Sequence, residues 1–306
     1  MFDLIDIFAK HKVLVIQLGG GEPLLHPDFF GIVEYAKTSG IEVLFSTNGT
    51  LVDVSKAARL KQLDFSQVQV SLDGPNPKIH DHFRGVAGAF ERALNGIRIL
   101  SSAGIGVNIA CTLTSLNAPY IEDMIKCAIS LHAISFRTMV MMPAGRAVNN
   151  VDLMLSNSEV GNIIARLRVL RDKYKDSLTI MYDAPFIPKD ESKPSGKPLD
   201  EIEVYFAGCA AGKRECKVFA NGDVVPCALF SSKEMIAGNV RTTSFEKIWF
   251  ESDLMKKFRL RSYKLINGKC RECKFGYICN GGCPAVAYNL TGMLNIPDPR
   301  CEYEGS

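Results

Sequence analysis

The stretch Gln67–Gly74 reads QVQVSLDG, and it decides how the chain around it is interpreted. Side chains alternate between the two faces of a β-strand, so Gln69, Ser71 and Asp73 share one face and the apolar residues between them share the other. A parallel strand covered by helices on both faces is almost continuously apolar. This strand therefore predicts a sheet with one packed face and one polar face.

Other strands repeat this pattern between helical segments. Short β-rich runs lie at Val13–Leu18, Ile41–Ser46, Val68–Leu72, Val107–Thr112 and Ile134–Met141. Phe90–Leu100 has helical periodicity, and Ser156–Tyr174 opens with a capping box formed by Ser156 and Glu159. Alternating strands and helices predict parallel βα units. The polar strand faces favour a curved, barrel-like sheet around a ligand, with an open doubly wound sheet as the alternative.

Composition and charge exclude several classes of protein. The 306 residues are 47% hydrophobic and 23% charged, and the net charge is +3; these values are ordinary for a globular protein. No basic run with interleaved aromatics indicates a nucleic-acid partner, and no stretch of about 18 apolar residues indicates a membrane span. Asp3 and Asp6 argue against a signal peptide. We therefore expect a cytoplasmic protein with no nucleic-acid partner and no membrane partner.

The cysteines are concentrated in the last third of the chain. Residues 186–206 are rich in proline, lysine and serine and predict a linker. Eight of the ten cysteines follow it, and in a reducing compartment such a module is held together by metal. Zinc ribbons use two C-x2-C pairs, and here only Cys270 and Cys273 form one, so iron–sulfur is favoured over zinc and disulfides come third. A capped helix is expected to start near Thr243, with Glu246 three residues later.

The spacing of these cysteines, with the phrases FANGDVVPCALF, AGNV, SFEKIW and CNGGCPA, resembles the SPASM domain of radical S-adenosylmethionine (SAM) enzymes. The resemblance implies two auxiliary [4Fe–4S] clusters. It assigns the first cluster to Cys209, Cys216, Cys227 and Cys283, and the second to Cys270, Cys273, Cys279 and Cys301. Cys111 and Cys127 match nothing in the pattern and are expected to be small buried side chains.

The glycine turn GGEP, directly after the first strand, resembles the corresponding motif of the radical SAM barrel. The segments FSTNGTLVD, SLDG and HDHFRG follow in the order expected for that family. Glycines let the backbone approach a ligand closely, and a planar guanidinium pairs well with the methionyl carboxylate of SAM. For Arg84, a solvated surface arginine is the alternative. The implied SAM-binding residues are Gly20, Gly21, Glu22, Pro23, Ser46, Thr47, Asn48, Ser71, Asp73 and Arg84.

The expected fold class is α/β, with a small cysteine-rich domain after a barrel. Residues 1–185 are assigned to a partial (β/α)6 radical SAM barrel, TIM-barrel-like and lacking its first strand, 186–206 to the linker and 207–306 to the SPASM domain. In that family a C-x3-C-x2-C motif after the first strand binds a third [4Fe–4S] cluster and SAM, whereas no cysteine precedes Cys111 here. We expect truncation, with natural loss as the alternative. The third cluster would then need the missing N-terminus to be restored.

The resemblance implies an oxidoreductase-type enzyme that forms a 5′-deoxyadenosyl radical from SAM. Its substrate would be a peptide, a protein or a tetrapyrrole haem precursor, and MPAGRA at residues 142–147, with Ala184-Pro185, points loosely to the haem branch. Expected partners are that peptide or small-molecule substrate and an electron donor such as flavodoxin or ferredoxin. No catalytic residue is assigned, and whether this chain acts alone stays open. The alternatives are a non-catalytic iron–sulfur electron carrier or scaffold, and a zinc-stapled binding module.

Overall fold

A computed structural model describes residues 1–183 and 209–301 and divides the chain into two compact units. Unit 1 comprises Met1–Met141 and Asp152–Ala184, and unit 2 comprises Met142–Val151 and Pro185–Ser306. The predicted linker at 186–206 and the dipeptide at 184–185 lie outside the described residues.

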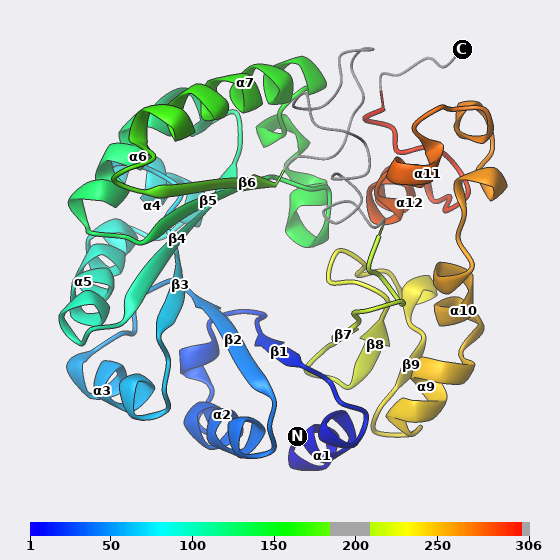
Figure 1. The fold of residues 1–306 in the computed structure, drawn as a ribbon, viewed down its shortest axis with the longest axis horizontal. Helices are drawn as coiled ribbons and strands as arrows, with labels where there is room; N and C mark the ends of the chain where they lie inside the picture. Colours follow the sequence, from blue (N-terminus) through cyan, green and yellow to red (C-terminus); the bar gives the residue numbers. More distant parts are fainter. Residues whose placement is uncertain (184–208, 302–306) are drawn as a thin grey trace. The chain divides into compact units, whose positions relative to one another are not determined.

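Unit 1 is built on a six-stranded parallel sheet whose strands follow the order of the chain. In Figure 1 the strands follow an arc, with the helices of this unit on its outer side. The predicted parallel α/β sheet is confirmed, and the last strand is one that the sequence pattern did not indicate. The strands are β1 (Val15–Leu18), β2 (Glu42–Thr47), β3 (Gln67–Ser71), β4 (Gly106–Leu113), β5 (Ser135–Val140) and β6 (Thr179–Asp183).

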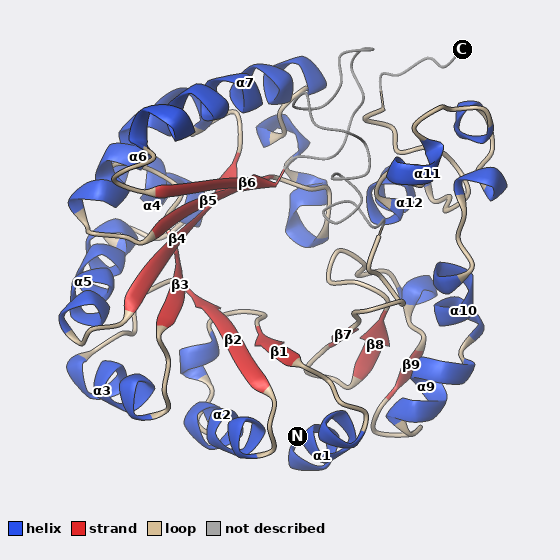
Figure 2. Cartoon of the chain, viewed as in Figure 1, coloured by secondary structure: helices blue, strands red, loops and turns tan. Residues whose placement is uncertain are grey.

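Helices cover one face of this sheet (Figure 2). The predicted capping box at the start of the last helix is confirmed, because the Ser156 N–H donates to Glu159 at 2.8 Å and the Glu159 N–H donates to the Ser156 hydroxyl at 3.4 Å. The helices are α1 (Phe2–Lys10), α2 (Phe29–Thr38), α3 (Val54–Gln62), α4 (Pro77–Arg84), α5 (Ala89–Ser102), α6 (Ile121–Ser130) and α7 (Asn157–Tyr174), with short 3-10 turns η1 (Pro23–Leu25) and η2 (Ala118–Tyr120).

The alternation of the strands separates a packed face from an open face. Val43 and Phe45 of β2 and Val68 and Val70 of β3 are buried in the core beneath the helices. Burying each such side chain contributes about 1.5–3 kcal/mol, so the packed face fixes the register of the sheet. The other face, here called the open face, carries the residues between them, which are half-buried or exposed.

Unit 2 has a small antiparallel sheet and short helices around two apolar clusters. Phe230 packs with Phe258 in one cluster, and Ile248 packs with Val224 and Met255 in the other. The strands are β7 (Lys217–Val218), β8 (Asp223–Val225) and β9 (Gly238–Asn239); the helices are α9 (Phe245–Glu251), α10 (Asp253–Arg259), α11 (Gly276–Cys279) and α12 (Pro284–Thr291), and the 3-10 turns include η3 (Gly145–Asn149), η6 (Lys233–Met235), η7 (Tyr263–Leu265) and η8 (Lys269–Arg271).

The expected start of the helix near Thr243 is wrong by one residue. The N-cap of α9 is Ser244, whose hydroxyl accepts a hydrogen bond from the Lys247 N–H at 3.3 Å. Both hydroxyl residues are good caps by type, so the packing of the helix decides between them.

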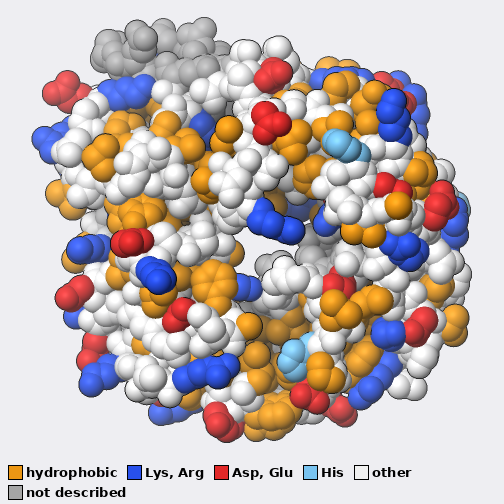
Figure 3. Space-filling model, turned by 180° about the vertical axis from the view of Figure 1, so that it is seen from behind, with side chains coloured by type: hydrophobic (Ala, Val, Ile, Leu, Met, Phe, Trp, Pro, Cys, Tyr) orange, Lys and Arg blue, Asp and Glu red, His pale blue; other side chains and the backbone are white. Residues whose placement is uncertain are grey.

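Acidic and basic side chains are interspersed on the face of the molecule drawn in Figure 3. This mixture agrees with the small net charge of +3. Among the described residues, no helix combines the length and the apolar character needed to cross a membrane.

Candidate cofactor and cluster sites

The glycine turn follows β1 and leads into η1. Gly20 has a φ of +135°, a region that side chains rarely adopt, and a Cβ added at Gly20 or Gly21 would meet nothing within 4 Å. The backbone of this turn is therefore open to a ligand. Pro23 is the first residue of η1, and Glu22 is its N-cap, accepting from the Leu24 N–H at 3.3 Å.

Glu22 joins this turn to the loop after β2. Its carboxylate accepts from the Thr47 hydroxyl and from the Asn48 backbone N–H, each at 2.7 Å. The Thr47 hydroxyl in turn accepts from the Gly49 N–H at 3.0 Å, and the Asn48 side-chain oxygen accepts from the Thr50 N–H at 2.8 Å. The structure thus brings two predicted SAM segments together and gives the Glu22 carboxylate a structural role.

Asp73 and Arg84 form an ion pair beside the end of β3. The distance between Asp73 Oδ2 and Arg84 Nη2 is 2.5 Å; the Asp73 side chain is 1% exposed and the Arg84 side chain 31%. Asp73 Oδ1 also accepts from the Thr112 N–H at 2.8 Å, at the carboxyl end of β4. The carboxylate is therefore turned into the protein, while the partly exposed guanidinium still has surface for a ligand.

A buried polar network supports this pair, and one member was not found from the sequence. The Asp73 N–H donates to His80 Nδ1 at 3.0 Å, so His80 accepts through a neutral ring, and burial lowers the pKa of His80. Asn117 is fully buried and its Nδ2 donates to the carbonyls of Asp73 at 3.0 Å and Thr112 at 2.8 Å. Asn117 belongs to no recognisable sequence motif. It lies near the end of β3 only because the chain folds in this way.

The open face of the sheet carries polar side chains that hydrogen-bond between neighbouring strands. Gln69 donates to the predicted site residue Ser46 at 2.7 Å, and Ser135 donates to Asn108 at 2.6 Å. Farther along β5, Arg137 lies in register with Met181 of β6. Arg137 is exposed, and so are Met139 and Met181, at 51% and 42%. Exposed methionines beside an arginine on a sheet face are typical of a ligand surface. Ser71, at the end of β3, is half-buried on the same face.

Three of the four cysteines assigned to the first cluster lie together in unit 2. Cys209, Cys227 and Cys283 pack against the Phe230 cluster. Burial raises the pKa of Cys227 to about 12, and the negative charges of Cys209 and Cys283 act on it in the same direction. The fourth member, Cys216, packs against the other apolar cluster, that of Val224, Ile248 and Met255. Burial raises its pKa to about 12 as well, and the nearby charges are those of Glu215 and Arg259.

The four cysteines assigned to the second cluster are close enough for their charges to affect the pKa of Cys270 and of Cys279. The charges of Cys273 and Cys301 raise the pKa of Cys270, after the larger effect of burial. Burial raises the pKa of Cys279 to about 11, and the charges of Cys270 and Cys301 add to it. Cys279 ends α11, and Cys301 donates its N–H to the Asp298 carbonyl at 2.9 Å. The structure thus groups the cysteines of the second set, whereas in the first set it groups Cys209, Cys227 and Cys283 and leaves Cys216 on the other apolar cluster.

The donor set fits clusters better than single zinc ions. All ten cysteines lie within the described residues, and none of them forms a disulfide there. Within that part of the chain, no three histidine, cysteine, aspartate or glutamate side chains are placed to hold one metal ion. A structural zinc needs four ligands at about 2.0–2.3 Å, whereas a [4Fe–4S] cluster carries its thiolates on separate irons and spreads them more widely. The thiol chemistry of the two assigned sets therefore fits iron–sulfur clusters.

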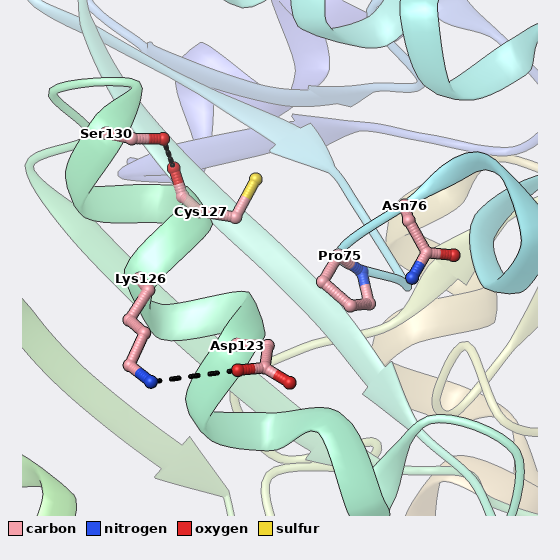
Figure 4. Close-up of a pocket in the computed structure, with 6 residues that line it drawn as sticks. All are labelled: Pro75, Asn76, Asp123, Lys126, Cys127 and Ser130. Carbon is pink, nitrogen blue, oxygen red and sulfur yellow. Dashed lines mark hydrogen bonds and ion pairs between the residues drawn. The ribbon is translucent and has the colours of Figure 1, made fainter.

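The two remaining cysteines are not placed with either set. Cys111 is fully buried in the core of unit 1, as expected, and Cys127 on α6 is half-buried. Cys127 lines a groove of 520 Å³ between α6 and the loop after β3 (Figure 4). Lys126 and Asp123 in this groove pair with each other at 3.8 Å, and burial raises the pKa of the Cys127 thiol. The groove contains none of the predicted cofactor residues, so we do not assign the site to it.

Comparison with known proteins shows the family to which this chain belongs. The model of the radical SAM superfamily matches residues 1–128, and that of the SPASM iron–sulfur cluster-binding domain matches residues 209–274. The AdoMet-dependent heme synthase of Nitratidesulfovibrio vulgaris is 31% identical over 307 residues, which cover 98% of this chain and 82% of the relative. The chain belongs to the radical SAM superfamily. It is thereby an enzyme by family, and SAM and iron–sulfur clusters are its cofactors.

Other relatives of this radical SAM enzyme are named for different activities. The mycofactocin maturase MftC of Mycobacterium tuberculosis is 30% identical, covering 98% of this chain and 73% of the relative. Among solved structures, Streptococcus suis SuiB bound to its precursor peptide SuiA has a TM-score of 0.82 at 18% identity, covering 98% of this chain and 69% of SuiB. At that identity the likeness shows the shared fold, and it confirms the predicted radical SAM and SPASM architecture.

Proposed function

We propose that this radical SAM/SPASM enzyme modifies a tetrapyrrole that carries carboxylate groups. The observation that carries the proposal is the relationship to AdoMet-dependent heme synthases at 30–31% identity over 98% of this chain. The open face supports it, because Arg137 supplies a cation for a carboxylate and Met139 and Met181 supply apolar surface for a ring system.

The cofactor sites of the proposal follow the predicted residues. SAM would lie at the carboxyl ends of the strands, where Glu22 holds the two loops together and Asp73 fixes Arg84 for the methionyl carboxylate. The SAM-site residues are Gly20, Gly21, Glu22, Pro23, Ser46, Thr47, Asn48, Ser71, Asp73 and Arg84. The first auxiliary cluster would be held by Cys209, Cys216, Cys227 and Cys283, and the second by Cys270, Cys273, Cys279 and Cys301.

The domain limits and the electron donor complete the proposal. We assign 1–185 to the SAM-binding barrel and 207–306 to the cluster domain. The family models at 1–128 and 209–274 support this division, although residues 142–151 group with unit 2. The clusters, when bound, supply one-electron chemistry. A one-electron carrier of the flavodoxin or ferredoxin type is therefore the expected donor.

Iron and sulfide analysis tests the cluster assignment. After anaerobic reconstitution, the chain is expected to hold about eight irons and matching sulfide. Cys227→Ser and Cys279→Ser should each lower the iron content, and the control Cys111→Ser should not, because Cys111 belongs to neither set. Two zinc ions without sulfide would contradict the proposal.

Titration with a propionate-bearing iron porphyrin tests the substrate class. Binding is followed by the porphyrin absorbance, a readout that needs no turnover. Arg137→Gln should weaken binding about tenfold, since a charge-assisted hydrogen bond contributes about 1.5–3 kcal/mol. The matched control is Arg168→Gln, an exposed arginine on α7. Porphyrin esterified at its propionates should bind the natural chain and Arg137→Gln equally. Failure of the natural chain to bind the free acid would overturn the substrate class.

A peptide is the second candidate substrate, because the mycofactocin maturases are also 30% identical over 98% of this chain. A peptide offers the same carboxylate chemistry through its C-terminus or an acidic side chain. Competition between porphyrin and a peptide with a free or an amidated C-terminus separates the two candidates.

A further inference from the structure

Arg261 lies just after α10 and is fastened to the turn between two predicted cluster ligands. Its Nη1 donates to the Asn280 carbonyl at 3.2 Å, and the Asn280 side chain donates back to the Arg261 carbonyl at 3.2 Å. A Cβ added at Gly281 would lie 3.4 Å from Arg261 Nη2. The guanidinium therefore rests against the backbone that joins Cys279 to Cys283.

Two other nitrogens of this guanidinium have no hydrogen-bond partner in the described part of the chain. Arg261 Nε and Nη2 are buried, and neither makes a hydrogen bond within the described residues. A buried charged donor without a partner costs several kcal/mol, and native proteins rarely leave one unmet. Two such atoms on one side chain therefore point to an acceptor other than an atom of the described residues.

The groups around Arg261 indicate what this acceptor is. Burial lowers the pKa of Arg261, and the charges that act against this effect belong to four cysteines. Cys209 and Cys283 come from the first set, whereas Cys270 and Cys279 come from the second. Arginine stays protonated in proteins, so a fixed positive charge lies near cysteines of both sets, beside the turn that joins Cys279 to Cys283.

We propose that Arg261 is a positioning residue shared by the two auxiliary clusters, with Nε and Nη2 donating to cluster or thiolate sulfur and the guanidinium setting both reduction potentials. The inference rests on the proposed cluster assignment. Hydrogen bonds to sulfur and net charge near a cluster tune its potential. Because a cation stabilises the more negative, reduced form, Arg261 is expected to raise the potential of both clusters. Burial keeps this effect from being screened by salt.

Redox titration of the reconstituted chain tests the inference. Each cluster takes one electron from dithionite, and electron paramagnetic resonance follows the reduced fraction while iron analysis reports loading. Arg261→Met should lower the ratio of reduced to oxidised cluster at least tenfold at a fixed potential, a shift of about 59 mV for a one-electron couple. Arg261→Lys keeps the positive charge but loses the planar set of N–H donors. Its cluster potentials should therefore lie between those of Arg261→Met and those of the natural chain.

Arg241→Met is the matched control, because it removes one charge from an exposed arginine of unit 2 that donates to the Ala220 carbonyl. It should leave both potentials unchanged. The inference is overturned if Arg261→Met binds about eight irons and both clusters keep the reduction potentials of the natural chain. It is also overturned if the potential of only one cluster changes, or if neither Arg261 variant binds iron. A natural chain that holds no iron would instead overturn the cluster assignment itself.

Discussion

The Glu22 carboxylate accepts a hydrogen bond from the Asn48 backbone N–H at 2.7 Å, although 26 residues separate them. It accepts from the Thr47 hydroxyl at the same distance. One side chain therefore connects the loop after β1 to the loop after β2. Each of these loops carries one of the predicted SAM-binding segments. The first prediction depends on this connection.

Glu22→Ala should lower the free energy of unfolding of unit 1 by about 1.5–3 kcal/mol. It leaves the Thr47 hydroxyl, which is buried, and the Asn48 N–H without their charged acceptor. Glu22→Gln keeps an acceptor oxygen and should cost less. Urea denaturation by circular dichroism measures the change, while Trp249, the single tryptophan, reports unit 2 separately. Glu34→Ala, exposed on α2, should change the free energy by no more than about 0.5 kcal/mol; an equal loss there would refute the argument.

Arg84→Met should destabilise unit 1 by about 3 kcal/mol, because it leaves the buried Asp73 carboxylate without its counter-ion. Breaking a buried ion pair costs about 3–5 kcal/mol, and the lower value is expected here because the Arg84 side chain is 31% exposed. The control is Lys173→Met, which breaks a 2.7 Å pair with Glu122 on the surface and should cost less than about 1 kcal/mol. Equal costs for the two variants would show that burial of Asp73 does not matter. The same urea experiment measures both.

Stability should fall as the pH decreases below 6.5, through His80. Burial lowers the folded-state pKa of His80 below the ordinary histidine value of about 6.5, so below that pH the unfolded chain binds more protons than the folded chain. One proton limits the slope to about 1.4 kcal/mol per pH unit. His80→Asn, which keeps an acceptor for the Asp73 N–H, should remove this part of the slope. His82→Asn, on the exposed side of the same helix, should keep it.

Gly282→Ala should prevent normal cluster loading. Gly282 has a φ of +75°, and an added Cβ would lie 2.4 Å from the Cβ of Asp298, whose carboxylate accepts from the Cys283 N–H. The substitution therefore displaces the turn that carries two predicted ligands. Gly292→Ala is matched in φ, at +74°, but its Cβ would meet nothing. It should cost only about 1–2 kcal/mol and load normally. The iron content per chain is measured for both variants. Equal iron contents would contradict the claim that this turn positions the cluster ligands.

Local patterns were sufficient for the elements and for the type of chemistry. The alternation in Gln67–Gly74 indicated a sheet with one packed face, and the Ser156–Glu159 spacing indicated the start of α7, because period and capping act over a few residues. β6 was missed, and the cap of α9 was placed one residue early, since packing decides short strands and helix ends.

The partners of the site residues could not be read from those patterns. The sequence by itself determined that the chain has parallel βα units, a glycine turn with oxygen-bearing strand ends, and thiol ligands in its last third. Only the tertiary structure decided that Asp73 faces Arg84, that Asn117 supports β3 and that Arg261 lies among cysteines of both sets. Periodicity fixes which way a side chain points, whereas a contact between distant residues exists only once the packed core has fixed the register of the elements that carry them.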